Sequence, residues 1–158
     1  SKAMRIFNFY PIGRAKKAFA AWDFDCNAFS AAFTSFYNQH FYDDLEMTKY
    51  YYIGLRMDRK DSEFMGLYEL GGSIFINDEY LEKLPAKKFN KQLFVILLHE
   101  MMHWIQYTFY KWDDAKITEG MVTSKCEAEL MCLKFEKQAR HVLKLYNTLK
   151  CIQKHEYR

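Results

Sequence analysis

The chain has 158 residues, half of them apolar and 18% aromatic, so it can bury a core of its own, and an intrinsically disordered protein is excluded. Its formal net charge of +3 permits contact with DNA or another acidic partner without requiring it. The four cysteines include no CxxC pair, which excludes a zinc finger or zinc ribbon and indicates a reducing compartment.

An aromatic helix is the first predicted element. From about Ala15 to His40, apolar residues recur at intervals of three and four, which is the spacing of one helical face. We expect a break in this helix near Asp23–Asp25. Three strands follow, the last two joined by a tight turn, and they cover Tyr50–Met57, Phe64–Leu70 and Ser73–Asn77.

Two helices complete the predicted fold. Pro85 opens a helix over Ala86–Phe109. The polar segment Lys111–Thr118 is expected to be a loop, and a long last helix begins near Gly120 and continues into the 140s. Residues 1–158 are thus predicted to form a single α+β domain, with an aromatic N-terminal helix, a sheet of about three strands and two C-terminal helices.

The first of these two helices contains the motif HExxH, made by His99, Glu100 and His103. Positions i and i+4 lie on the same face of a helix, so both imidazoles can reach one ion. Zinc held by two histidines and a third ligand keeps a position open for water and lowers the pKa of that water. Glu100 would then serve as the general base in peptide hydrolysis. The alternative is a pair of hydrogen-bonded core histidines with Glu100 as their partner.

Several side chains that follow His103 are candidates for the third zinc ligand. Asp114 has the spacing of the aspartate-type zincins, and carboxylates on the last helix would match the gluzincins. Each candidate has an ordinary role as a surface side chain, so the residues alone leave the choice open. The candidates are Asp113, Asp114, Glu119, Glu127, Glu129 and, more remotely, His141.

Three motifs between about Phe29 and Leu130 resemble the SprT-like family, the group that includes the Spartan proteases. They are the opening-helix run Phe36–Phe41, the strand pattern Gly66-Leu67-Tyr68 followed by Ile74–Asn77, and the helix segment Leu97–His103. The resemblance implies a zincin-like fold and a zinc peptidase that cuts proteins, some of them crosslinked to DNA.

The same resemblance ranks the candidates for the third ligand. The family usually has a histidine followed by glycine at the start of the next helix, where this chain has Glu119-Gly120. A carboxylate is an acceptable zinc ligand. The resemblance therefore implies that Glu119 completes a His-His-Glu site, ahead of Glu127 and Asp114.

The function expected from the sequence is that of a zinc-dependent endopeptidase acting on protein or peptide substrates. One alternative is a DNA- or protein-binding module with a structural or vestigial zinc site, and another is a hydrolase of non-peptide amides. In zincins a strand near the active-site helix pairs with the extended substrate, and Ser73–Asn77 is the candidate here. A tyrosine is expected to donate a hydrogen bond to the oxyanion; the candidates are Tyr68, Tyr107 and Tyr110.

The expected location of the protein is the cytoplasm, or a host's cytoplasm if a phage encodes it. Residues 1–13 lack the apolar stretch of a secretory signal, and no apolar run is long enough to span a membrane. We therefore expect no secretion and no membrane partner. The oligomeric state and the identity of the protein substrate are open.

Overall fold

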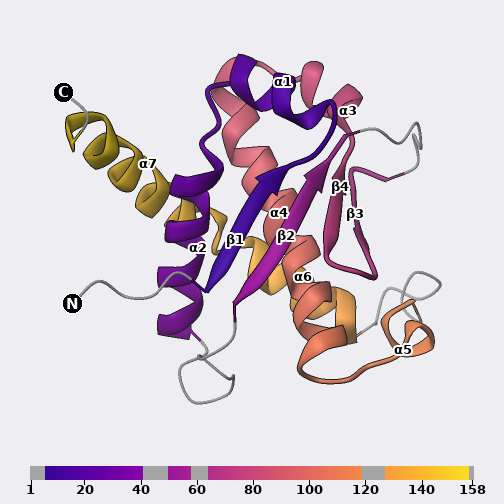
Figure 1. Cartoon of the computed structure of the whole chain (residues 1–158). Coiled ribbons are helices and arrows are strands. Elements are labelled where there is room, and N and C mark those ends of the chain that lie inside the picture. Colours follow the sequence, from indigo (N-terminus) through magenta and orange to yellow (C-terminus); the bar gives the residue numbers. More distant parts are fainter. Residues whose placement is uncertain (1–5, 41–49, 58–63, 119–126, 157–158) are drawn as a thin grey trace.

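A computed structural model of the chain describes residues 6–40, 50–57, 64–118 and 127–156 (Figure 1). Over these residues the protein is mixed α+β, mostly helical, with one four-stranded sheet. The elements in chain order are β1 (Phe7–Pro11), α1 (Ala15–Ala21), α2 (Cys26–His40), β2 (Tyr51–Arg56), β3 (Gly66–Glu69), β4 (Ser73–Ile76), α3 (Asp78–Glu82), α4 (Ala86–Thr108), α5 (Asp114–Thr118), α6 (Glu127–Glu136) and α7 (Ala139–Glu156).

The sheet has the order β1-β2-β4-β3. The pairs β1–β2 and β2–β4 are parallel, and β3 is antiparallel to β4. The strand expected at the edge, Ser73–Asn77, is therefore an interior strand, and β3 is the edge strand on this side of the sheet. Burial explains this position: Ile74 and Ile76 of β4 are fully buried, whereas the side chains of β3 are half-exposed. A strand with neighbours on both sides suits the more apolar sequence.

Figure 1 shows α4 crossing behind the sheet and α2 lying beside β1. The rings that join these layers explain why the N-terminal part of the chain is rich in aromatic residues. The ring of Phe7 on β1 lies 4.9 Å from that of Phe33 on α2 and 5.3 Å from that of Trp104 on α4, both edge-on. Edge-to-face contacts of this kind stabilise a core beyond simple burial. These contacts pack α4 against the inner face of the sheet.

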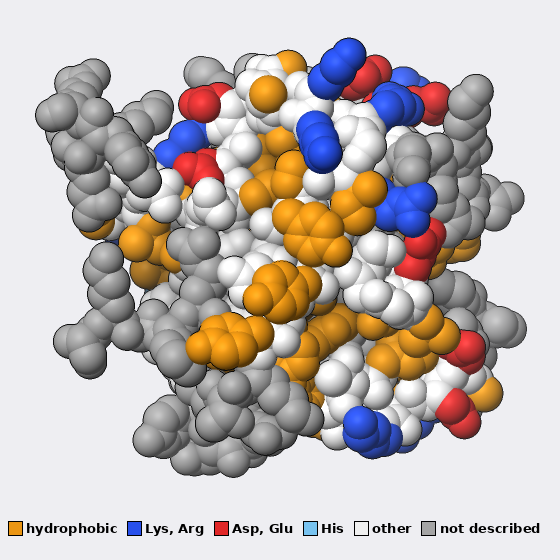
Figure 2. Space-filling view, in the orientation of Figure 1, with side chains coloured by type: hydrophobic (Ala, Val, Ile, Leu, Met, Phe, Trp, Pro, Cys, Tyr) orange, Lys and Arg blue, Asp and Glu red, His pale blue; other side chains and the backbone are white. Residues whose placement is uncertain are grey.

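The opposite face of the sheet carries exposed aromatic side chains. Figure 2 shows apolar side chains gathered over the strands on the side turned to the viewer. Tyr10 and Tyr52 belong to this outer face and are 44% and 65% exposed. None of the helices in the described part of the chain has the length and apolarity that crossing a bilayer requires.

The predicted α+β class is confirmed, and three of its details are wrong. The sheet has a fourth strand, β1, whose alternating buried and exposed residues had not been recognised as a strand. The expected C-terminal helix is two helices, α6 and α7, and part of the expected loop before it is the short helix α5. The segment 119–126 lies outside the described residues.

The break expected in the N-terminal helix is confirmed, and Asp25 explains it. One oxygen of its carboxylate accepts hydrogen bonds from the backbone N–H groups of Asn27 and Ala28, at 2.9 and 3.1 Å. A side chain that caps these groups starts a new helix and so separates α2 from α1. The HExxH helix matches its prediction to within one residue at its C-terminal end.

Candidate metal centre

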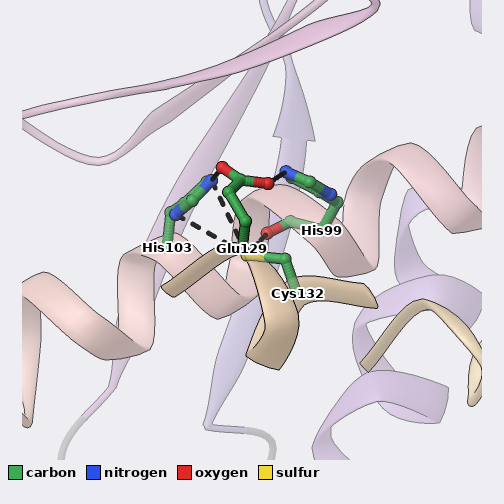
Figure 3. A group of neighbouring side chains, drawn as sticks. All are labelled: His99, His103, Glu129 and Cys132. Carbon is green, nitrogen blue, oxygen red and sulfur yellow. Dashed lines mark hydrogen bonds and ion pairs between the residues drawn. The ribbon is translucent and has the colours of Figure 1, made fainter. Parts of the chain in front are cut away.

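Two crossing helices bring four potential ligands together. Helix α4 supplies His99 and His103 from adjacent turns, and α6, which packs across it, supplies Glu129 and Cys132 (Figure 3). The potential ligand atoms of the four side chains lie within 4.8 Å of one another, so the group could hold a metal ion. The helix spacing alone brings the two histidines together, whereas only the packing of α6 adds the other two.

The carboxylate of Glu129 lies between the two imidazoles. Its Oε2 is 3.4 Å from Nε2 of His99, and its Oε1 is 3.3 Å from Nε2 of His103. Ligands bonded at about 2.0–2.1 Å to one tetrahedral ion are separated by about 3.3–3.4 Å. Each of these two distances is of the size that separates two ligands of one ion, so the three side chains could share a metal ion.

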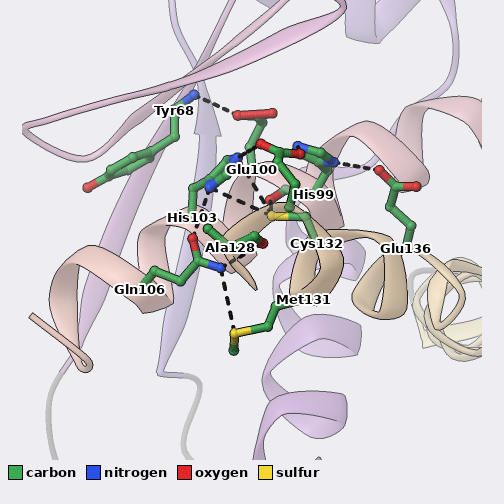
Figure 4. Close-up of polar contacts among 10 residues, drawn as sticks. Tyr68, His99, Glu100, His103, Gln106, Ala128, Met131, Cys132 and Glu136 are labelled. Atoms are coloured by element: carbon green, nitrogen blue, oxygen red, sulfur yellow. Dashed lines mark hydrogen bonds and ion pairs between the residues drawn. The ribbon is translucent and has the colours of Figure 1, made fainter. Parts of the chain in front are cut away.

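A buried glutamine determines which nitrogen of His103 faces this centre. Gln106 is fully buried, and its amide nitrogen donates a hydrogen bond to the carbonyl of Ala128 at 3.0 Å (Figure 4). A carbonyl only accepts, so the amide oxygen of Gln106 must be the atom that lies 3.0 Å from Nδ1 of His103. Nδ1 consequently carries a proton, and in the neutral ring Nε2 is the bare nitrogen that can bind a metal.

His99 is oriented by a second carboxylate. Oε1 of Glu136, on α6, lies 2.5 Å from Nδ1 of His99. Hydrogen bonds of this kind fix the ring of a ligating histidine and make its other nitrogen a better donor to a metal. Both imidazoles are thus held at Nδ1 and present Nε2 to Glu129, which is the arrangement of a metal site with its outer hydrogen bonds in place.

The pKa values of the metal-free protein reflect the crowding of charge here. Burial opposes protonation of His99, but the hydrogen bond to Glu136 and the nearby carboxylates outweigh it and raise its pKa. The hydrogen bond to His103 lowers the pKa of Glu129. The carboxylates around the two rings therefore favour a positive charge between them. At low pH protons on the rings supply this charge, and when the rings are neutral a metal ion can supply it.

Glu100 points toward a pocket that also contains these ligands. The backbone N–H of Tyr68, on the edge strand β3, donates a hydrogen bond to Oε1 of Glu100 at 2.9 Å (Figure 4). Burial of the carboxyl, which is 6% exposed, raises the pKa of Glu100 despite the two histidines and this hydrogen bond. A carboxylate with a raised pKa is better suited to take up a proton.

Cys132 lies close to the centre but beside the ring of His103. Its Sγ is 3.6 Å from Nε2 and 3.7 Å from Nδ1. An atom in line with the lone pair of Nε2 would be far from Nδ1, so nearly equal distances place the sulfur against the ring. The thiol also lies 3.6 Å from the carbonyl oxygen of His99, to which it donates. In this conformation His99, His103 and Glu129 face one another across the centre, and the thiol of Cys132 lies beside them, within the group of four potential ligands.

The remaining candidates for the third ligand lie elsewhere. Glu127 is exposed and forms an ion pair with Lys116 at 3.5 Å. Asp114 accepts a hydrogen bond from the hydroxyl of Tyr107, and Asp113 accepts one from a backbone N–H of its own turn. His141 is an exposed residue of α7, and Glu119, the predicted ligand, lies outside the described residues.

Among the described carboxylates, Glu129 is the one that faces both histidines. It had been one of several candidates for the third ligand, and its neighbours favoured it. Ala128 and Cys132 are buried, so Glu129 lies at the border of the buried face of α6. The roles of Gln106 and Glu136 could not be read from the sequence, because each depends on the crossing of α4 and α6.

Two of the three candidate tyrosines line the pocket, Tyr68 and Tyr107. The hydroxyl of Tyr107 is engaged by Asp114, and burial together with that carboxylate raises the pKa of Tyr107. Tyr110 is not among the pocket-lining residues; its ring packs against Trp112. Tyr68 and Tyr107 therefore stay the candidates for an oxyanion donor.

Comparison with known proteins adds no assignment. No protein-family model matches the chain, and neither a curated protein nor a solved structure matches it. The resemblance to the SprT-like family, with the zincin fold that it implies, therefore stays a prediction from the motifs.

Proposed function

We propose that the protein is a zinc-dependent endopeptidase whose ligands are His99, His103 and Glu129 and whose general base is Glu100. The observation that carries the proposal is the position of Glu129, with one carboxylate oxygen facing Nε2 of each histidine at 3.3–3.4 Å. Two imidazoles and a carboxylate are one of the ligand sets of catalytic zinc. The proposal assigns to Glu129 the place predicted for Glu119, which lies outside the described residues.

Each residue has a separate task in the proposed reaction. Zinc held at this site would polarise the scissile carbonyl and lower the pKa of a water molecule. Glu100 lines the same pocket as the ligands, and it would accept the proton of the attacking water and pass it to the leaving amine. The N–H of Tyr68 keeps the Glu100 carboxylate turned toward the pocket.

The outer edge of strand β3 is an argument for a polypeptide as the substrate. The carbonyls of Met65 and Glu69 accept hydrogen bonds from the hairpin side, from Asn77 and Gly72. Because backbone groups alternate along a strand, those of Gly66 and Tyr68 face away from β4 and toward the cleft. The N–H of Tyr68 is donated to Glu100, so the backbone groups of Gly66 and the carbonyl of Tyr68 are the ones that a substrate strand would use. An extended peptide could pair with this edge, as strand-adding ligands do. The substrate strand predicted at Ser73–Asn77 is thus replaced by β3.

A structural zinc site is the competing interpretation, and the position of Cys132 argues against it. Structural zinc is usually enclosed by four protein ligands. The Sγ of Cys132 lies beside the ring of His103 and away from the direction of Nε2. The three proposed ligands all line the pocket, and a metal ion held by them would be accessible from it, which suits turnover of a substrate.

The test is the variant Glu100→Gln in the zinc-loaded full chain. Zinc content should match that of the wild type, while cleavage of a reduced, carboxymethylated protein should fall by about 100- to 10,000-fold because the general base is lost. The exposed residue Glu82 provides a control, since Glu82→Gln should leave the rate unchanged. Zinc binding without cleavage by the wild type would contradict the peptidase proposal and favour a binding module.

A further inference from the structure

The pocket beside the metal centre is long. It has a volume of about 520 Å³ and is lined by residues of α4 from Gln92 to Tyr107, with β3 along one side and α6 along the other. These two residues are 15 positions apart in one helix, and at 1.5 Å per residue they are separated by about 22 Å. An extended chain rises about 3.3 Å per residue, so about six or seven residues fit along this length.

The end of the pocket nearest the start of α4 is apolar. Val95 and Ile96 of the helix face Met65 and Leu67, which lie in or just before β3. Helix and strand approach closely here, because a Cβ added to Gly66 would lie 2.5 Å from Cγ2 of Ile96. The wall is therefore packed, and it offers an apolar surface to bulky apolar side chains, which would cover Met65, a residue that is 48% exposed.

Besides its two histidines, the pocket has charged side chains of one sign among the described lining residues. The ionisable residues that line it, besides the histidines and tyrosines, are Glu100, Glu129 and Glu136, and no lysine or arginine is among the described lining residues. A bound divalent cation would offset part of this charge. Among the described residues, the apolar end has no positive group that could pair with an acidic substrate. Anionic side chains would lose water there without gaining a partner.

From these observations we infer that the cleft selects extended polypeptide segments with bulky apolar side chains and rejects acidic ones. This inference rests on the proposed function, because the bound segments are substrates only if the protein is a peptidase. Apolar side chains are mostly inside folded proteins. A chain that presents several of them in an extended stretch is unfolded or unfolding, so the substrates are unfolded protein segments.

The test measures binding separately from cleavage. The zinc-loaded Glu100→Gln chain is titrated with three fluorescent seven-residue peptides in which serine alternates with leucine, lysine or aspartate. Alternate side chains of an extended peptide point to the same side, so each peptide presents one type to the apolar wall. The leucine peptide should bind about 10- to 100-fold more tightly than the aspartate peptide, with the lysine peptide between them.

Two substitutions relate this preference to the pocket. Val95→Lys places a positive charge at the apolar end. It should reduce the ratio of the affinity for the leucine peptide to the affinity for the aspartate peptide by about tenfold. Gln92→Lys, at a half-exposed position of the same wall, provides a second variant if Val95→Lys fails to fold. The matched control is Leu133→Lys, an equally large change at a 51% exposed position on α6 outside the pocket, which should leave the ratio unchanged.

The outcomes separate this inference from the proposed function. Equal affinity for the three peptides, or tightest binding of the lysine peptide, would overturn the inference. A leucine preference that Val95→Lys and Gln92→Lys leave intact would also overturn it, because the selectivity would then lie elsewhere. A pocket-dependent leucine preference in a protein that cleaves nothing would support the inference while refuting the peptidase proposal.

Discussion

Replacing Gln106 with methionine should weaken metal binding, although Gln106 is not a ligand. The substitution keeps the length of the side chain and removes both of its hydrogen-bonding groups. It leaves Nδ1 of His103 without its acceptor and the carbonyl of Ala128, on α6, without its donor. The tautomer of His103 and the position of the backbone next to Glu129 would both lose their support.

The magnitude follows from the burial of the partners. Gln106 is fully buried, His103 is 8% exposed and Ala128 is 1% exposed, so water cannot replace the lost bonds without rearrangement. Each buried group left without a partner destabilises the fold by about 1–3 kcal/mol. Loss of a hydrogen bond that orients a ligating histidine lowers metal affinity by about 10- to 100-fold.

The assay compares thermal unfolding of the Gln106→Met chain with and without zinc. A metal that binds only the folded state stabilises it in proportion to the logarithm of its affinity, so the zinc-induced rise in Tm should be smaller in the variant. Nitrogen NMR of His103 in the metal-free chain should show proton occupancy at Nδ1 in the wild type and a mixture in the variant. Met131→Leu is the control, since it changes a half-buried neighbour of Gln106 and leaves both hydrogen bonds in place.

One result would refute this reasoning about Gln106. If the variant is less stable in both forms while the zinc-induced rise in Tm equals that of the wild type, Gln106 only holds α4 and α6 together. The carboxylate of a Gln106→Glu variant can still accept the Nδ1 proton. If the zinc-induced rise in Tm of this variant equals that of the wild type, the hydrogen bond to His103 is the one on which zinc binding depends.

Three further predictions concern the site and its wall. Glu129→Gln should lose most of the zinc affinity, measured by competition with a chelator, whereas Glu127→Gln at an exposed position of the same helix should bind zinc like the wild type. Gly66→Ala should destabilise the fold by about 1–3 kcal/mol because its Cβ would overlap Ile96, and a double-mutant cycle with Ile96→Ala should show a favourable coupling; independent effects would contradict the contact. The pKa of His99 is raised in the folded chain, whereas in the unfolded chain it has its usual value near 6.5. Protonation of His99 therefore stabilises the metal-free fold fully below pH 6.5, and this stabilisation is lost as the pH rises through the higher pKa of the folded state. Zinc must displace the same proton, so zinc affinity should increase from pH 6 to pH 8, and an affinity independent of pH would count against His99 as a ligand.

The elements that could be predicted from the sequence are those with local signals. Helix α4 has Pro85 before it and a long apolar periodicity within it, and Asp25 marks the start of α2. The division between α6 and α7 had no such signal, and the interior position of β4, although it suits the apolar residues of that strand, depends on which strands pair with it. Both follow from which surfaces are left to be buried once α4 has packed on the sheet.

The pairing of His99 and His103 on one face of a helix, with Glu100 beside them, was determined by the sequence itself. The reason is that the geometry of an α-helix places residues i and i+4 together whatever surrounds them. The third carboxylate, the glutamine that orients His103 and the strand that borders the cleft were decided by the tertiary structure. Glu129 lies 26 positions after His103 on a different helix, and only the packing of α6 across α4 brings its carboxylate between the two imidazoles.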